Sequence, residues 1–159
     1  MRTLAGAGNN SELVLAGGDQ AAIYRTDNGG DSWVLSNEGM PVGASVQVIA
    51  FDPTHPRTVY AGTDHVGIFR SADAGATWTA FVTESEFSGT YALLPVDGST
   101  LLAGVTRGVF RIDPATGTWQ TVASVFDTDV HVQLILYDRA AGVLYAGGTG
   151  GLFRIDWAP

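Results

Sequence analysis

Asp127, Asp129 and His131 stand at alternate positions of one short segment and could hold a divalent cation. Alternate residues of an extended chain point to the same side, and carboxylate oxygens and imidazole nitrogens are common ligands of such ions. Elsewhere the sequence offers no dedicated fourth ligand. The competing interpretation is a polar loop that leads into a strand beginning near His131. We favour the loop and expect neither a bound metal nor a cofactor.

Glu84 and Glu86 are the second candidates, because two carboxylates that face each other at a suitable separation can hydrolyse a glycosidic bond. Adjacent acids on a loop are more often simply hydrated. The 3 histidines are scattered and form no Ser-His-Asp arrangement. The absence of Cys and Lys excludes thiolate nucleophiles and Schiff-base chemistry. These residues therefore favour a protein without catalysis of its own.

The composition is that of one acidic globular domain. The chain has 159 residues, of which 45% are hydrophobic and 15% charged, and its formal net charge is −8. With 8 Lys+Arg against 16 Asp+Glu, it is a poor candidate for nucleic-acid binding, which depends on clustered cations. The sequence contains no run of about 18 apolar residues, so it predicts no membrane-spanning helix. The N-terminal residues lack the apolar segment of an export signal.

Short apolar segments recur along the whole chain at intervals of 42 to 45 residues. Those with an Ala-Gly pair are LVLAGG (13–18), TVYAGT (58–63), TLLAGV (100–105) and VLYAGG (143–148). Each is followed by a segment that ends in Arg, namely AIYR (22–25), GIFR (67–70), GVFR (108–111) and GLFR (151–154). Short β-branched or aromatic segments between Gly, Pro, Asn and Asp are typical of strands. With a strand before each pair and a Trp-led strand after the first three, the pattern predicts an all-β, four-bladed β-propeller unit.

The predicted blades of this single unit cover approximately residues 2–37, 45–84, 90–124 and 130–157. The last blade lacks its outer strand. An open array would expose the apolar faces of its end blades. We therefore favour a homodimer in which two chains pair head to tail and complete an eight-bladed ring. The alternatives are a closed four-bladed monomer and a piece of a longer protein.

The turn between the third and fourth predicted strands carries the most specific pattern. It reads SADAGATW at 71–78 and TDNGGDSW at 26–33, and the third repeat keeps only its Gly-x-Trp end. An Asp or Asn side chain can accept backbone N–H bonds across such a turn, Gly supplies a positive φ, and Trp packs at the base of the hairpin. We therefore expect a structural role for Asn28, Gly30, Trp33, Ser71, Asp73, Gly75, Thr77, Trp78, Gly117 and Trp119.

The stretch IAFDPTHPRTVYAGTDHVGIFRSADAGATW at 49–78 resembles the BNR, or Asp-box, propeller repeat. This repeat occurs in photosystem II stability/assembly factor-like proteins, sortilin-type receptor domains and xyloglucanase-type glycoside hydrolases. The resemblance covers essentially the whole chain as repeats, but it is specific for architecture only, because fold does not imply function. It implies that the Asp-box turns lie away from the ligand face and that the protein is extracytoplasmic.

One Arg recurs in each repeat, as Arg25, Arg70, Arg111 and Arg154. Sialidases also carry Asp-boxes and use an arginine cluster, so this series needs an interpretation. A residue that returns in every blade is explained by the repeat itself. We therefore expect these side chains to pair with nearby carboxylates rather than to form a ring that binds an anion.

Two sets of loops are expected to share one face, where binding residues usually lie. Their candidate ligand-face residues are Asp19, Glu38, Asp64, His65, Glu84, Glu86, Arg107, Asp127 and Asp129. This mainly acidic face favours a cationic, polyhydroxylated or protein partner. We interpret the chain as a non-catalytic binding or assembly scaffold for a protein or glycan partner. The alternatives are a glycan-active, glycoside hydrolase-like module, or part of one, and a propeller fragment without a ligand.

Overall fold

The computed structural model describes residues 1–159 except 9, 21, 107, 124–129 and 158–159. The described residues form antiparallel strands in four sheets and a single short 3-10 helix, η1 (Ser85–Phe87). Within each sheet the strands are hydrogen-bonded in the order in which they follow in the chain. This arrangement confirms the predicted all-β propeller, and we name the sheets blades one to four.

Blade one consists of β1 (Thr3–Ala7), β2 (Asn10–Gly17), β3 (Ile23–Thr26) and β4 (Val34–Leu35). Blade two consists of β5 (Val46–Phe51), β6 (Val59–Thr63), β7 (Ile68–Ser71) and β8 (Thr79–Val82). Blade three consists of β9 (Thr90–Pro95), β10 (Leu101–Val105), β11 (Gly108–Ile112) and β12 (Trp119–Ala123). Blade four has three strands among the described residues, β13 (Val132–Asp138), β14 (Val143–Gly148) and β15 (Gly151–Asp156), as predicted.

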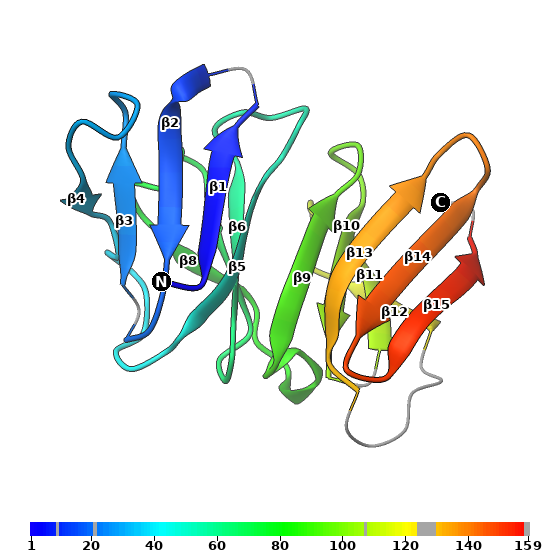
Figure 1. Ribbon diagram of the computed structural model, residues 1–159. Helices are drawn as coiled ribbons and strands as arrows, with labels where there is room; N and C mark the ends of the chain where they lie inside the picture. Colours follow the sequence, from blue (N-terminus) through cyan, green and yellow to red (C-terminus); the bar gives the residue numbers. More distant parts are fainter. Residues whose placement is uncertain (9, 21, 107, 124–129, 158–159) are drawn as a thin grey trace.

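The blades stand side by side in chain order, and blades one and four lie at opposite ends of the row (Figure 1). The first strand of each blade contacts the first strand of the next, from β1 to β5, β5 to β9 and β9 to β13. The hydrophobic core therefore lies between blades. One buried cluster joins blades one and two, a second joins blades two and three, and a third joins blades three and four.

The Ala-Gly pair of the second strand allows the next blade to come close in blades one to three. A Cβ atom on Gly62 would lie 2.6 Å from the Thr90 methyl group of blade three, and one on Gly17 would lie 2.7 Å from a methyl group of Val46 in blade two. Both distances are shorter than a carbon–carbon contact allows, so a side chain at either position would push two blades apart. Gly is required here by the approach of the next blade.

The first and second strands pair in the same register in all four blades. In all four blades the Ala of the pair is opposite an apolar residue of the first strand, which is Leu4, Ile49, Leu93 or Ile135. Because side chains alternate along a strand, equivalent positions point towards the same neighbour in every blade. A side chain can therefore be compared directly with its equivalents in the other three blades.

Candidate functional site

The loops that follow each second strand lie beside those that lead into each first strand. The backbone amide of Ser45 donates to the Asp64 carboxylate (2.9 Å), and the Thr106 amide donates to the Gly89 carbonyl (3.1 Å). The two loop sets therefore share one face, as predicted. It is the lower edge of the sheets in Figure 1, where η1 also lies. We call it the loop face.

The acids of the two short loops are held by local partners. Asp19 accepts from the Arg2 guanidinium at 2.6 Å, and this hydrogen bond lowers the pKa of the Asp19 carboxyl. Asp64 accepts from the Ser45 amide and lies 3.6 Å from the exposed imidazole of His65. These carboxylates order the ends of strands in their own blades.

The acids of the two longer loops point into solvent. Glu38 is exposed, while its backbone carbonyl accepts from the Trp78 amide of blade two (2.9 Å). Glu84 precedes η1 and Glu86 lies within it, where the Glu86 carboxylate accepts from the Ser85 hydroxyl (3.2 Å). Both glutamates are exposed, which is the hydrated arrangement that the sequence favours.

Arg107, Asp127 and Asp129 lie outside the described residues, so the metal-binding hypothesis for Asp127, Asp129 and His131 stays a prediction. The part of the chain that the structure describes contains no group of three His, Cys, Asp or Glu side chains that could hold a metal ion. His131 is half-buried and stacks edge-on against Tyr91, with ring centroids 4.8 Å apart.

Sequence reasoning did not identify the partners of His131. Its Nδ1 lies 3.3 Å from the Thr106 hydroxyl, and its backbone amide donates to the Thr149 hydroxyl (3.0 Å). Thr106 and Thr149 follow the second strands of blades three and four, where blades one and two carry Asp19 and Asp64. The sequence could have indicated that Thr106 and Thr149 are at the repeat position of Asp19 and Asp64. It could not indicate that Thr106 lies beside His131.

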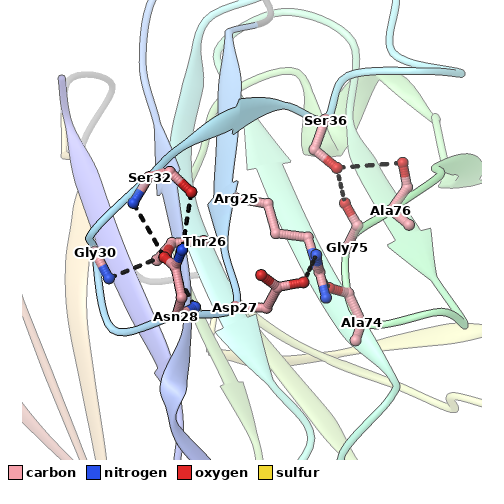
Figure 2. A network of polar contacts seen from close by, with 10 residues as sticks. All are labelled: Arg25, Thr26, Asp27, Asn28, Gly30, Ser32, Ser36, Ala74, Gly75 and Ala76. Atoms are coloured by element: carbon pink, nitrogen blue, oxygen red, sulfur yellow. Dashed lines mark hydrogen bonds and ion pairs between the residues drawn. The ribbon is translucent and has the colours of Figure 1, made fainter.

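The turns at 26–33 and 71–78 share a set of hydrogen bonds (Figure 2 shows the first turn). In each, the first hydroxyl donates to the central Asn or Asp side chain at 2.7 Å and accepts from the amide of Gly30 or Gly75. The same Asn or Asp oxygen accepts from the amide of Ser32 or Thr77. One polar side chain thus closes each hairpin, as the residue pattern predicts.

Glycine supplies the backbone conformation that these turns need. Gly30 has φ +100° and Gly75 has φ +83°. In the third blade Gly117 also has a positive φ, +75°, but its amide donates to the Asp113 carbonyl (2.8 Å) rather than to a side chain. The third turn therefore has a glycine one position closer to its Trp and a different set of hydrogen bonds, in which Asp113 accepts from the Ala115 amide and Thr116 from the Thr118 amide.

The Trp residues of the three turns differ in their surroundings. Trp78 is 3% exposed and its indole N–H donates to the Ser36 carbonyl of blade one (2.9 Å). Trp119 is half-buried and packs edge-on against Phe87 and Phe110. Trp33, in blade one, is 41% exposed. Tryptophan burial therefore depends on the presence of a preceding blade.

Asp73 titrates far below an ordinary aspartate. Partial burial raises its pKa, but hydrogen bonds from the Thr77 amide, the Ser71 hydroxyl and the Thr77 hydroxyl outweigh this effect and lower the pKa from 3.8 to about 2. A folded-state pKa below the unfolded value stabilises the fold above the unfolded pKa and loses this contribution as pH falls through the folded pKa. The relevant window therefore runs from 3.8 down to about 2.

Asp73→Asn is accordingly expected to remove part of the acid sensitivity of the fold. Asn28 already occupies this place in the sister turn and donates to Ser32 (2.9 Å), so we expect a small change at pH 7 and a smaller loss of stability than in the unmodified protein at acid pH. Urea unfolding at several pH values between 2 and 5 measures this difference. Asp31→Asn, at an exposed position of the sister turn, is the control and should keep the original pH profile.

Two of the repeated Arg side chains connect neighbouring blades. Arg25 of blade one donates to the Ala74 carbonyl in the turn of blade two (3.3 Å), and Arg70 donates to the Pro114 carbonyl in the turn of blade three (3.1 Å) (Figure 2 shows Arg25). Arg25 also pairs with Asp27 at 3.1 Å. Arg154 pairs with Asp156 at 2.8 Å.

The expected carboxylate partners are therefore present for Arg25 and Arg154 but not for Arg70. The residue two places after Arg70 is Ala72, where the other three blades have Asp27, Asp113 and Asp156. Arg70 instead stacks its guanidinium over the Phe81 ring, 5.9 Å from the centroid. The expectation of a carboxylate was wrong for Arg70 because the repeat conserves the Arg and not its neighbour.

A cavity of about 560 Å³ lies between β1 and β5, and Ala5, Ala7, Ile49, Phe51 and Asp52 are among its lining residues. Asp52 accepts from the backbone amides of Thr54 and His55 and from the Thr54 hydroxyl. These bonds occupy the Asp52 carboxylate in a turn. None of the predicted ligand-face residues that the structure describes lines this cavity.

Among the described residues no helix is long or apolar enough to cross a lipid bilayer. No protein-family model and no curated protein sequence matches the chain.

Several solved structures share its fold. The GH74 xyloglucanase from Xanthomonas campestris is 16% identical with a TM-score of 0.74, and the match covers 95% of this chain and 28% of that one. YCF48 bound to D1 peptide is 19% identical with a TM-score of 0.64, covering 96% and 48% of the two chains. The computationally designed Ika4 protein is 15% identical with a TM-score of 0.69, covering 98% and 90%.

The chain thus spans under a third of the xyloglucanase and about half of YCF48. Identities this low support a common β-propeller fold and leave chemistry open.

Proposed function

We propose that the chain is a non-catalytic β-propeller scaffold, built from BNR/Asp-box repeats, that binds a protein or glycan partner on its loop face. The observation that carries this proposal is the state of the loop-face acids. Asp19 and Asp64 hold loop backbone and side chains of their own blades, and the exposed glutamates lie in solvent. An acidic, preformed and exposed surface of this kind suits recognition of a cationic or polyhydroxylated partner better than bond cleavage.

The assignment to the BNR/Asp-box repeat is supported by the paired turns at 26–33 and 71–78. A repeat defined by a central Asp or Asn, a following Gly and a terminal Trp requires those residue types to have separate structural roles. In both turns the acid or amide closes the hairpin and the Gly has a positive φ. The role that we propose for Asn28, Asp73 and their neighbours is therefore structural.

Two of the similar structures indicate opposite functions. One is a xyloglucanase, whereas another is described as bound to a peptide. The alternative function for this chain is accordingly a glycan-active, glycoside hydrolase-like module, or part of one. A third hypothesis, a propeller fragment without any ligand, predicts neither partner binding nor glycan hydrolysis.

A glycan array and a peptide array, combined with an assay for hydrolysis of aryl glycosides and xyloglucan, separate these functions. The proposal predicts saturable binding with no hydrolysis above background. A Glu84→Gln/Glu86→Gln variant should weaken binding of a cationic peptide, whereas Asp113→Asn, in the third turn, serves as the control. Hydrolysis that disappears in the glutamate variant would establish the alternative.

We further propose that the functional scaffold is a homodimer that completes an eight-bladed ring. The alternative closed four-bladed monomer requires blade one to pack against blade four. Among the described residues the extensive contacts between blades run from one to two, two to three and three to four. This open row favours two copies over closure within one chain.

A further inference from the structure

The free face of blade four, which no other blade covers among the described residues, presents a third-strand residue whose equivalents are buried in the other three blades. Ile23, Ile68 and Val109 occupy one register position in the third strands, opposite Gly17, Gly62 and Gly104. All three are 0% exposed and pack in the clusters shared with the following blade. Leu152 occupies the same position opposite Gly147 and is 77% exposed. Leu152 is exposed because no blade among the described residues packs against this face.

The free face of blade one presents a residue whose equivalents in blades two and three are buried against the preceding blade. Ile49 and Leu93 pack against the preceding blade and are 5% and 9% exposed. Leu4 has the same register in blade one and is 67% exposed. Blade one thus presents the residues that meet a preceding blade, and blade four presents the residues that meet a following one. The two free faces are complementary to each other and not to themselves.

The Arg residues that recur in each blade indicate which hydrogen bond a following blade would accept. Arg25 and Arg70 each donate to a carbonyl in the third-to-fourth strand turn of the next blade. Arg111 has the same register in blade three, but blade four contains no fourth strand among the described residues and so offers no such turn. Arg111 instead lines a small polar cavity with Ser99 and Asp113.

Arg154 is the fourth member of the series and lies on the free face. Blade one has a complete turn of the required kind, in which Gly29 stands where the turn of blade two has Ala74. Both residues have positive φ, +69° and +63°. The Ala74 carbonyl accepts from Arg25, so the Gly29 carbonyl is oriented to accept from a blade that precedes blade one.

We infer that blade four of one copy binds blade one of a second copy, with Leu152 packing near Leu4 of the partner subunit and Arg154 donating to the carbonyl of Gly29 of the partner subunit. This inference deepens the homodimer proposed above and rests on it. The occupant is a second copy because each free face lacks the neighbour that the other provides. Two such contacts close eight blades, within the range of known propellers.

Light scattering between about 1 and 100 µM tests the faces in this inference. Leu4→Asp and Leu152→Asp should each raise the dimer dissociation constant at least about 100-fold, because a carboxylate then enters an apolar contact twice per ring. Val42→Asp is the matched control, since Val42 is fully exposed on a loop, and should leave the dissociation constant unchanged. Circular dichroism establishes that each variant keeps its strands.

Mixing the two interface variants distinguishes head-to-tail pairing from other arrangements. A Leu4→Asp copy still has an intact blade four, and a Leu152→Asp copy still has an intact blade one. The equimolar mixture should therefore form a pair through one intact contact, whereas each variant alone remains at the mass of a single chain. Pairing of either variant alone, or a mixture that stays monomeric, would overturn the inference without affecting the binding and hydrolysis assays.

Arg154→Ala tests the polar contact separately. The expected result is a roughly 100-fold weaker dimer, because a hydrogen bond to a charged group, worth about tenfold, is lost twice per ring. Arg111→Ala, at the same register but with no turn to reach, should change the dissociation constant by less than about twofold. Equal effects of the two substitutions would overturn the assignment of Arg154. Covering of the faces by an unrelated protein would appear as a monomer of the purified chain at every concentration and would also overturn it.

Discussion

Replacing Trp78 by Ala is expected to lower the free energy of unfolding by about 3–5 kcal/mol, the usual cost of removing a large buried aromatic side chain. Trp78 is 3% exposed and belongs to the cluster that joins blades one and two. The substitution also leaves the Ser36 carbonyl without its indole donor. Urea unfolding at one fixed protein concentration measures the change, since concentration affects the stability of a dimer.

Trp33→Ala is the matched control for this prediction. Trp33 has the same position in the turn of blade one but is 41% exposed, so its removal should cost only about 1 kcal/mol. The contrast tests whether the repeated Trp stabilises the protein through its hairpin or through the neighbouring blade. Equal losses for the two substitutions would contradict a role that depends on the preceding blade.

Gly39→Ala is expected to destabilise the protein by about 3–5 kcal/mol, from a left-handed backbone conformation and a steric overlap together. Gly39 has φ +88°, and a Cβ atom there would overlap the backbone carbonyl oxygen of Trp78. This carbonyl belongs to the backbone and cannot rotate away as a flexible side chain would. The substitution therefore separates the loop after blade one from blade two.

Gly43→Ala isolates the conformational part of that cost. Gly43 also has φ +88°, but no atom lies within 4 Å of the position of its Cβ. We expect a loss of about 1–2 kcal/mol, the cost of the left-handed conformation alone. The same urea experiment compares both variants, and similar losses at the two glycines would show that contact with Trp78 is unimportant.

Strand positions could be predicted from the sequence because the same apolar segments occur in four successive repeats. Each Ala-Gly segment aligns with an observed second strand, and the lack of a fourth Trp-led segment predicted the three strands that blade four has among the described residues. The turns at 26–33 and 71–78 were also predictable, since their hydrogen bonds are local and depend on residue type. Strands and turns whose residue patterns recur at a fixed spacing can be predicted without a structure.

Contacts between blades could not be predicted in the same way. The sequence indicates that Arg25 and Arg70 are equivalent, but it does not reveal that they reach carbonyls about one repeat further along the chain. Carbonyl acceptors are provided by every residue, so composition contains no signal for them. The contact of Tyr91 with His131 is hidden for the same reason, because it joins two different blades.

The mass of the unmodified chain in solution tests the central claim, that one chain is an open half of a propeller ring. Light scattering at tens of micromolar should give twice the chain mass of 16.6 kDa, because the free faces of blades one and four cover each other. A mass of 16.6 kDa at every concentration would contradict the claim and require either closure within one chain or end faces that tolerate water.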